Sequence, residues 1–438
     1  MLDTPASARD ALIERIVALN PGFYDTRHCG VNLYEPNTAQ LLNMQMSVDT
    51  LPLPDFDEYY DSIQKIFTRD DSRAAFRADA WLAMEGTRGC FAKCDFCDVH
   101  SSWSGFRKSS AELIADRTIA LAQRHRLARV KFMDNVCDTW AEEYADRLIA
   151  RKIRLTTFME CRVHHPERFW TKISMAGVEM VQVGIEALSP SLLMAMNKGT
   201  RAKQNLLVQK WLKELGIDSL SNLISHHPKS TLEHVKETKS ILELIPHFDR
   251  LDFSPLALLF NTPLDRRLTE AERRGGLEER QPFSLPKVLD PFFVRKGEYE
   301  PPEQWFAEGV MAAWDDLKKW EETFHKKCGD DASMTAARCN EEEVLISDRR
   351  YGALEEHVVE GDDARVYWLC HHGATLESLC RTLDLQPDRA LAIAGSLIER
   401  KILVNLEDCY IALALRPRDE LLHDCFMLPE RAVNAAAA

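Results

Sequence analysis

Three cysteines stand close together in the stretch Gly89-Cys90-Phe91-Ala92-Lys93-Cys94-Asp95-Phe96-Cys97. The spacing is C-x3-C-x2-C, and it follows the short apolar run 80–84. Three thiolates on one tight loop can hold three irons of a [4Fe–4S] cluster and leave the fourth iron without a protein ligand. A substrate can coordinate an open iron, so Cys90, Cys94 and Cys97 are predicted ligands of a reactive cluster.

Two other uses of the cysteine triplet are weaker. A disulfide framework is typical of small secreted chains, and this chain has 438 residues. A zinc site would need a fourth cysteine or histidine nearby. His100 is close in sequence and keeps the zinc interpretation open.

The composition limits the partners and the compartment. Lys and Arg number 55 against 69 Asp and Glu, which gives a net charge of −14 and disfavours nonspecific binding to nucleic acid or to an anionic membrane. We find no 18-residue apolar run and no signal peptide, so no membrane partner is expected. The cysteines outside the triplet are scattered, which indicates a reducing, cytoplasmic location.

The chain divides into four segments. We expect an N-terminal extension over 1–80, an α/β domain over 81–300, a helical connector over 301–345 and a winged-helix-like domain over 346–438. Strand and helix patterns alternate in the α/β domain, which predicts a parallel sheet with its chemistry at the carboxyl ends of the strands. The expected strands are 80–84, 128–133, 153–159, 180–186, 219–224 and 250–256.

The last segment reads as a small winged-helix module. Its expected helices are 365–370, 376–383 and 389–400, followed by a hairpin over 403–413 that turns at Glu407-Asp408. The module has no dense basic recognition helix, so packing or peptide binding is favoured over DNA binding.

The cysteine spacing, together with Phe96 before the last cysteine, resembles the radical S-adenosylmethionine (SAM) superfamily. The resemblance implies a partial (β/α)6 TIM barrel with a [4Fe–4S] cluster and SAM as cofactors. Further stretches are similar to methyltransferases of that superfamily that modify ribosomally made peptides. These stretches are Leu51–Tyr60, Arg107–Ser109, Phe132–Asn135, Gly184–Ser189, Asn197–Gly199 and Phe253–Pro255.

Two departures from those relatives matter. The relatives carry an N-terminal cobalamin-binding domain, and the segment before Leu51 is too short for one, so cobalamin is not expected. The relatives also show a Gly-Phe-Pro-Gly-Glu type stretch after the fifth strand, where this chain has Ser225-His226-His227-Pro228-Lys229. The substrate side of the pocket is therefore expected to differ.

The resemblance also implies which residues contact SAM. Phe96 would pack near the adenine, Asp134 or Asn135 would bind the amino group, and Arg162 would bind the carboxylate through a forked pair of hydrogen bonds. The full set of predicted cofactor-binding residues is Phe96, Asp134, Asn135, Glu160, Arg162, Gln182, Glu186 and Asn222. An Asx turn at Asp134, a rim salt bridge at Arg162, and a pairing of Glu186 with Arg162 or Lys198 are the structural alternatives.

The first functional hypothesis is a radical SAM enzyme of natural-product biosynthesis. It would form a new bond on a peptide or small molecule and take electrons from a flavodoxin or ferredoxin type donor. The residues do not identify a catalytic acid or base. His226 and His227 are candidate substrate contacts at the mouth of the barrel, although solvated loop histidines are common.

Two other hypotheses remain open. Radical SAM enzymes of arsinothricin biosynthesis are similar and lack the cobalamin domain; the resemblance implies transfer of a 3-amino-3-carboxypropyl group to trivalent arsenic. Such a substrate needs thiolates. Cys137 and Cys161 are the first candidates, and Cys29, Cys328 and Cys339 could fold over the mouth. The third hypothesis is a non-catalytic iron–sulfur sensor or peptide-binding adaptor.

Overall fold

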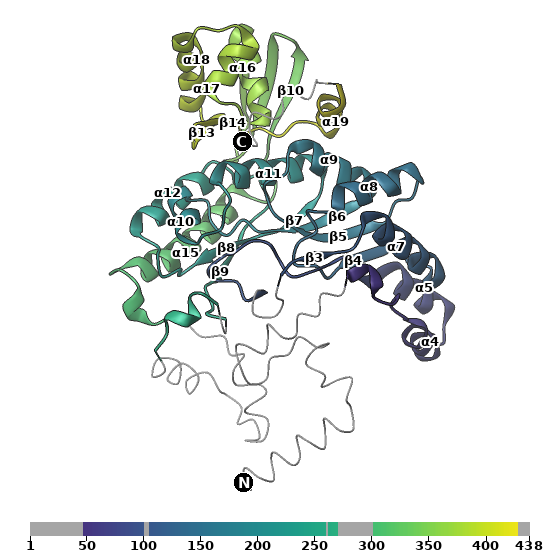
Figure 1. Cartoon of the computed structure of the whole chain (residues 1–438). Helices are drawn as coiled ribbons and strands as arrows, with labels where there is room; N and C mark the ends of the chain where they lie inside the picture. Colours follow the sequence, from purple (N-terminus) through teal and green to yellow (C-terminus); the bar gives the residue numbers. More distant parts are fainter. Residues whose placement is uncertain (1–46, 100–104, 260–261, 270–300, 428–438) are drawn as a thin grey trace.

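The computed structural model describes residues 47–99, 105–259, 262–269 and 301–427 (Figure 1). A parallel sheet with helices packed along it forms the centre of the molecule, and a smaller α/β module lies against these helices. The expected α/β class and partial-barrel topology are confirmed, and no closed barrel is present in the described ranges. Within these ranges, no helix combines the length and apolar character that crossing a bilayer requires.

Five parallel strands form the main sheet in the order β1-β4-β5-β6-β7. They are β1 (Trp81–Met84), β4 (Arg129–Phe132), β5 (Thr156–Cys161), β6 (Val178–Val183) and β7 (Asp218–Leu220). The sequential order is that of successive right-handed βαβ units, so each new strand is added at the same edge. The carboxyl ends of all five strands therefore meet at one edge of the sheet.

The expected fifth strand, 219–224, is divided in two. β7 ends at Leu220, and β8 (Asn222–Ser225) pairs in parallel with β9 (Asp252–Pro255) in a separate small sheet. The strand breaks where the chain after β6 pairs with it. The Glu186 N–H donates to the Asn222 carbonyl oxygen (3.0 Å), and the Ile224 N–H donates to the Glu186 carbonyl oxygen (2.8 Å). The main sheet and the small sheet thus form one curved arc of strands.

Helices follow the strands and cover the outer face of the arc (Figure 1). They are α7 (Ala111–His125), α8 (Ala141–Ala150), α9 (Glu167–Ala176), α10 (Pro190–Ala195), α11 (Ala202–Leu215) and α12 (Leu232–Leu242). Ser110, Ser189 and Thr231 cap three of them by accepting a backbone N–H in the first turn. The core between helices and sheet is apolar, as in the buried contact of Phe132 with Trp140 at 4.5 Å between ring centroids.

Small elements flank the beginning of the arc. The first described residues form η1 (Val48–Thr50), α4 (Asp57–Ile66) and α5 (Asp70–Asp79). After β1, the strands β2 (Thr87–Arg88) and β3 (Arg107–Lys108) pair antiparallel around the cysteine loop.

The segment after β9 is only partly helical. Short 3-10 turns η2 (Asp265–Arg267) and η4 (Glu303–Trp305) precede helix α15 (Val310–Cys328). The expected helical continuation to residue 345 is wrong, because β10 (Met334–Asn340) and β11 (Glu343–Asp348) form an antiparallel sheet there with β12 (Glu355–Glu360). Alternating buried side chains in β11, such as Val344 and Ile346, give the period of a strand.

The winged-helix elements lie close to their expected positions. They are α16 (Gly361–Leu369), η5 (Cys370–His372), α17 (Leu376–Leu383), α18 (Pro387–Glu399), β13 (Leu403–Leu406) and β14 (Cys409–Ala412), followed by α19 (Arg418–Met427). The predicted turn at Glu407-Asp408 is confirmed, since both residues have the left-handed φ, 54° and 59°, of a tight hairpin turn.

A buried ionic network joins this module to the barrel helices. Arg416 donates to Glu167 on α9 (2.5 Å) and to Glu214 on α11 (2.8 Å), and all three side chains are fully buried. His372 pairs with Glu167 at 2.5 Å. The hairpin makes a second connection, because the Glu407 carboxylate accepts the Lys203 N–H in the first turn of α11 (3.0 Å).

Candidate active site at the cysteine loop

The cysteine loop lies between β2 and β3, just beyond the carboxyl end of β1. Cys94 is buried, and Cys90 and Cys97 are half-buried. Burial raises the pKa of the Cys97 thiol to about 11, and the neighbouring Cys94 and Cys90 contribute to the rise. Three soft donors close together on one loop fit an iron–sulfur cluster, whose cations would stabilise the thiolates. His100, the residue that kept zinc open, lies outside the described residues.

Asp95 ties this loop to the far end of the strand arc. Its carboxylate lies 3.3 Å from His227 Nε2 and accepts a hydrogen bond from Lys229 Nζ (2.6 Å), both in the loop after β8. Burial raises the pKa of Asp95, but His227 and Lys229 outweigh it and hold the pKa below its usual value. The sequence did not point to Asp95, although a buried carboxylate needs a cation or hydrogen-bond donors.

The two predicted histidines therefore have partners within the protein. His227 is fully buried, and its Nδ1 accepts the Lys229 N–H at 3.2 Å, so its Nε2–H faces Asp95. His226 is half-buried with a left-handed φ of 56°, and its Nε2 lies 3.2 Å from the Asp315 carboxylate on α15. The structure places His227 as a support of the cysteine loop.

A second support comes from the loop after α10. The Asn197 side chain donates to the Lys93 carbonyl oxygen in the cysteine loop (2.8 Å). Lys198 is buried; its Nζ donates to Glu186 (2.8 Å) and lies 5.9 Å from the centre of the Phe96 ring. Of the alternatives for Glu186, the structure shows the pairing with Lys198.

Gly184 makes room for that ion pair. A Cβ at residue 184 would lie 2.5 Å from Lys198 Nζ and 3.0 Å from a Glu186 carboxylate oxygen. Both atoms end flexible side chains, so a Cβ at residue 184 would displace the ion pair rather than the backbone.

Arg162 joins the same region from the end of β5. Its guanidinium donates to the Lys198 carbonyl oxygen (2.6 Å) and lies 6.0 Å from the centre of the Phe91 ring in the cysteine loop. Its backbone N–H donates to Asp138 (2.9 Å). Phe96, Arg162 and Glu186, which come from three different strand ends, are thus brought together around Lys198.

Asp134 and Asn135 separate after β4. Asp134 is almost fully buried and accepts the Gly86 N–H with both oxygens (3.1 and 2.9 Å), which holds the turn between β1 and β2. Burial raises its pKa to about 6. Asn135 is exposed and makes no side-chain hydrogen bond within the described ranges. Asn135 is therefore the better placed of the two for a ligand.

The remaining predicted polar residues lie along the strands. Glu160 and Gln182 are paired in register on β5 and β6, with Glu160 half-buried and Gln182 exposed. Burial raises the pKa of Glu160, and Lys131 on β4 opposes the rise. Asn222 is exposed at the start of β8, in register with exposed Asp252. Neither the Gln182 nor the Asn222 side-chain amide makes a hydrogen bond within the described ranges.

The structure describes four of the five thiols considered for arsenic. Cys137 and Cys161 are buried in the apolar core, and burial raises both pKa values well above the usual value, which disfavours thiolates. Cys328 is buried at the end of α15, Cys339 is exposed on β10, and Cys29 lies outside the described residues.

Comparisons with known proteins agree with this arrangement. Residues 84–242 match the radical SAM superfamily. The chain is 23% identical over 199 residues to an uncharacterised methyltransferase of Pyrococcus horikoshii, covering 44% of this chain and 41% of the relative. It is 26% identical over 157 residues to the anaerobic magnesium-protoporphyrin IX monomethyl ester cyclase of Rubrivivax gelatinosus, covering 34% of this chain and 28% of the relative. The chain spans less than half the length of these relatives.

The matches among solved structures have low identity and TM-scores below 0.5. The cobalamin-dependent SAM radical enzyme OxsB, with aqua-cobalamin and SAM bound, is 16% identical with a TM-score of 0.45, over 64% of this chain and 44% of OxsB. The radical SAM methyltransferase TsrM from Kitasatospora setae, with tryptophan and a SAM analogue bound, is 17% identical with a TM-score of 0.41, over 56% of this chain and 53% of TsrM.

Proposed function

We propose that this radical SAM enzyme, whose radical SAM domain lies over residues 84–242, cleaves SAM reductively and forms a new bond on a peptide or small molecule in natural-product biosynthesis. The observation that carries the proposal is the clamped cysteine loop. Three thiols lie just beyond the carboxyl end of β1, and Asp95 and Lys93 anchor their loop to the loops after β8 and α10. Active sites of such barrels gather at that edge.

Different residues would hold the cluster and SAM. Cys90, Cys94 and Cys97 would bind a [4Fe–4S] cluster, which supplies one electron to break a carbon–sulfur bond of SAM. The exposed amides of Asn135, Gln182 and Asn222 are free to accept and donate hydrogen bonds to SAM.

Arg162 would meet the SAM carboxylate. Its planar guanidinium offers five N–H donors, and the hydrogen bond to the Lys198 carbonyl oxygen uses only part of them. The buried ion pair of Lys198 with Glu186 fixes the loop that positions Arg162. Phe91 and Phe96 supply apolar surface that excludes water from the reacting atoms.

The same proposal includes the partners. The reductant would be a flavodoxin or ferredoxin type protein, and the compartment the cytoplasm, where free cysteines such as Cys370 and Cys409 stay reduced. The acidic net charge of −14 argues against a nucleic-acid substrate.

Anaerobic turnover with product analysis tests the proposal. The reconstituted, dithionite-reduced protein is incubated with SAM, with and without cobalamin, and the products are measured by mass spectrometry. We expect 5′-deoxyadenosine from the wild type and none from the Cys90→Ala/Cys94→Ala/Cys97→Ala variant. Methylthioadenosine together with an aminocarboxypropyl adduct of added arsenite would instead indicate transfer of the 3-amino-3-carboxypropyl group to arsenic. No SAM product at all, with candidate substrates present, would indicate a sensor or adaptor.

A further inference from the structure

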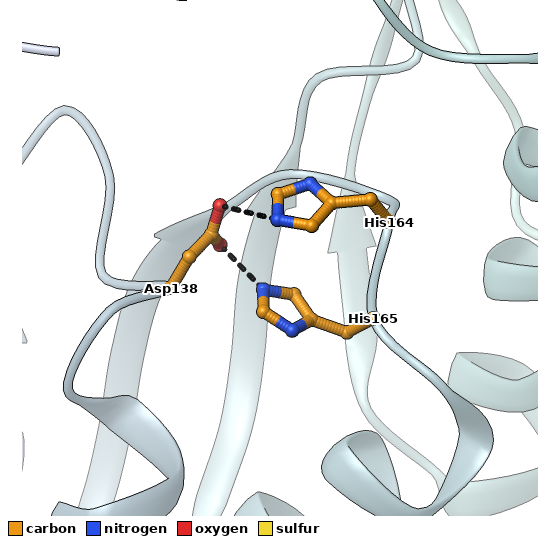
Figure 2. A group of neighbouring side chains, drawn as sticks. All are labelled: Asp138, His164 and His165. Atoms are coloured by element: carbon orange, nitrogen blue, oxygen red, sulfur yellow. Dashed lines mark ion pairs between the residues drawn. The ribbon is translucent and has the colours of Figure 1, made fainter. Parts of the chain in front are cut away.

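Asp138, His164 and His165 form a compact group of potential metal ligands that the proposed function does not use. One ligand atom from each residue lies within 4.8 Å of the other two (Figure 2). Asp138 belongs to the loop between β4 and α8, and the histidines belong to the loop between β5 and α9. The group therefore joins the carboxyl ends of two neighbouring strands.

The distances suit coordination of one ion. Asp138 Oδ1 lies 3.2 Å from His165 Nε2, and Asp138 Oδ2 lies 3.7 Å from His164 Nε2. Ligand atoms that surround a tetrahedral ion at about 2.0–2.1 Å are separated by roughly 3.3 Å. Small rotations of the side chains would bring all three atoms to one centre.

Two atoms of the group are buried without a hydrogen bond. The Asp138 side chain is only 2% exposed, and neither its Oδ2 nor His165 Nε2 has a hydrogen-bond partner within the described ranges. Leaving a buried polar atom unsatisfied costs about 1–3 kcal/mol. A bound cation would satisfy the carboxylate and the ring nitrogen together.

Surrounding contacts hold the ligands in place. The Arg162 N–H donates to Asp138 Oδ1 at 2.9 Å, which fixes the carboxylate. The His165 ring stacks on Phe169 at 3.8 Å with an interplanar angle of 14°. The charged end of Arg162 is directed to the Lys198 carbonyl oxygen. Metal sites depend on this kind of outer support for their ligands.

We propose that Asp138, His164 and His165 bind a divalent transition-metal ion of the Zn²⁺ or Fe²⁺ type. Two imidazoles and one carboxylate are a donor set that both ions accept, and three protein ligands leave a position for water or a small ligand. His164 is 39% exposed in its side chain, and its ring lies 6.4 Å from the Phe91 ring of the cysteine loop. The ion would thus be reached from solvent beside the cluster loop.

The alternative is an ion pair between Asp138 and a protonated histidine, with no metal. Both arrangements bring the same atoms together. They differ in whether the folded protein retains a stoichiometric ion that is bound by nitrogen and oxygen alone.

Zinc is the probe that separates them. The cluster-reconstituted protein is incubated anaerobically with Zn²⁺, desalted and analysed for zinc per chain and by zinc X-ray absorption. We expect about one zinc per chain with only nitrogen and oxygen neighbours at about 2.0–2.2 Å. The His164→Gln/His165→Gln variant should retain at least tenfold less zinc, with its folding checked by circular dichroism. His325→Gln is the matched control, because His325 pairs with Glu321 at 3.4 Å without a second histidine in the group.

Three outcomes would overturn the proposal. The first is no zinc retained by the folded wild type. The second is a sulfur neighbour at about 2.3 Å, which would place the zinc on cysteines. The third is equal retention by the double variant and the control. Of these, only the second result touches the cluster cysteines, and anaerobic SAM turnover with product analysis tests the proposed function separately.

Discussion

Asp95 and Lys229 form an ion pair, with Nζ 2.6 Å from Oδ2, that connects the loop after the first strand of the arc to the loop after β8. The two residues are 134 positions apart in sequence. Only a curved arc brings these loops together, so this pair is a direct consequence of the partial-barrel shape.

Asp95→Asn should weaken retention of the cluster. The amide would lose the charge that holds Lys229 and His227, and the cysteine loop would be less constrained. We expect the cluster absorbance to decay several-fold faster in the presence of an iron chelator. Asp316→Asn, a change at an exposed α15 carboxylate, should leave the decay rate unchanged. Equal decay in both variants would show that the Asp95 contacts do not support the cluster.

Gly184→Ala should weaken SAM binding more than it weakens the fold. The added methyl group would displace Lys198 from Glu186 and so disturb the loop beneath Arg162. Breaking a largely buried ion pair costs more than breaking an exposed one, so we expect at least a fivefold increase in the Kd for SAM, which corresponds to about 1 kcal/mol or more. Gly395→Ala on α18 is the control, because its Cβ would meet nothing within 4 Å. An unchanged Kd in G184A would exclude this role for the Lys198 pair.

Arg416→Met should destabilise the whole protein strongly. The change leaves Glu167 and Glu214 as buried carboxylates without their main cation. We expect a loss of about 3–5 kcal/mol in the free energy of unfolding by urea at pH 7. Arg381→Ala removes a pair that is exposed on α17 and should cost less than about 0.5 kcal/mol. A loss in R416M no larger than in R381A would contradict the expectation.

His247 should make stability fall as the solution becomes acidic. Burial lowers its pKa to about 3, while its Nε2–H donates to the Leu413 carbonyl oxygen (3.0 Å). The unfolded chain protonates this residue near pH 6.5, whereas the folded chain does not until about pH 3, so its contribution is complete above 6.5 and declines below it.

The slope from this one group is about 1.4 kcal/mol per pH unit. Between pH 6.5 and 5, the wild type should therefore lose roughly 2 kcal/mol more than His247→Gln in urea unfolding, with parallel curves above pH 7.5. Parallel curves over the whole range would mean that His247 is not held neutral.

Most of the fold was predicted from local sequence patterns. The predicted radical SAM resemblance and α/β class are confirmed, and the hairpin turn at Glu407-Asp408 lies where its residues indicated. The division of 219–224 into β7 and β8 was not predicted, because it depends on the pairing of Glu186 with Asn222 and Ile224. Pairings between residues so far apart in the chain cannot be predicted from one stretch of sequence.

Long-range contacts also explain what was missed at the site. Asp95 gains its role from His227 and Lys229, which no spacing rule relates to it. Cys137 follows β4 and Cys161 is the last residue of β5, but the packing of the core determines that both are buried. The His164-His165 pair becomes a candidate metal site only because the fold places Asp138 beside it.

The contact of Glu407 with Lys203 has a consequence for how the chain can be divided. The hairpin of the winged-helix module provides the hydrogen-bond acceptor at the start of α11, a helix more than two hundred residues earlier. Domain boundaries drawn along the sequence therefore cut across this contact. A barrel expressed alone would lose the Glu407 acceptor of the Lys203 N–H, although Gln204 would still accept the Arg201 N–H at the start of the same helix. We expect such a barrel to unfold at a lower temperature than the intact chain in calorimetry.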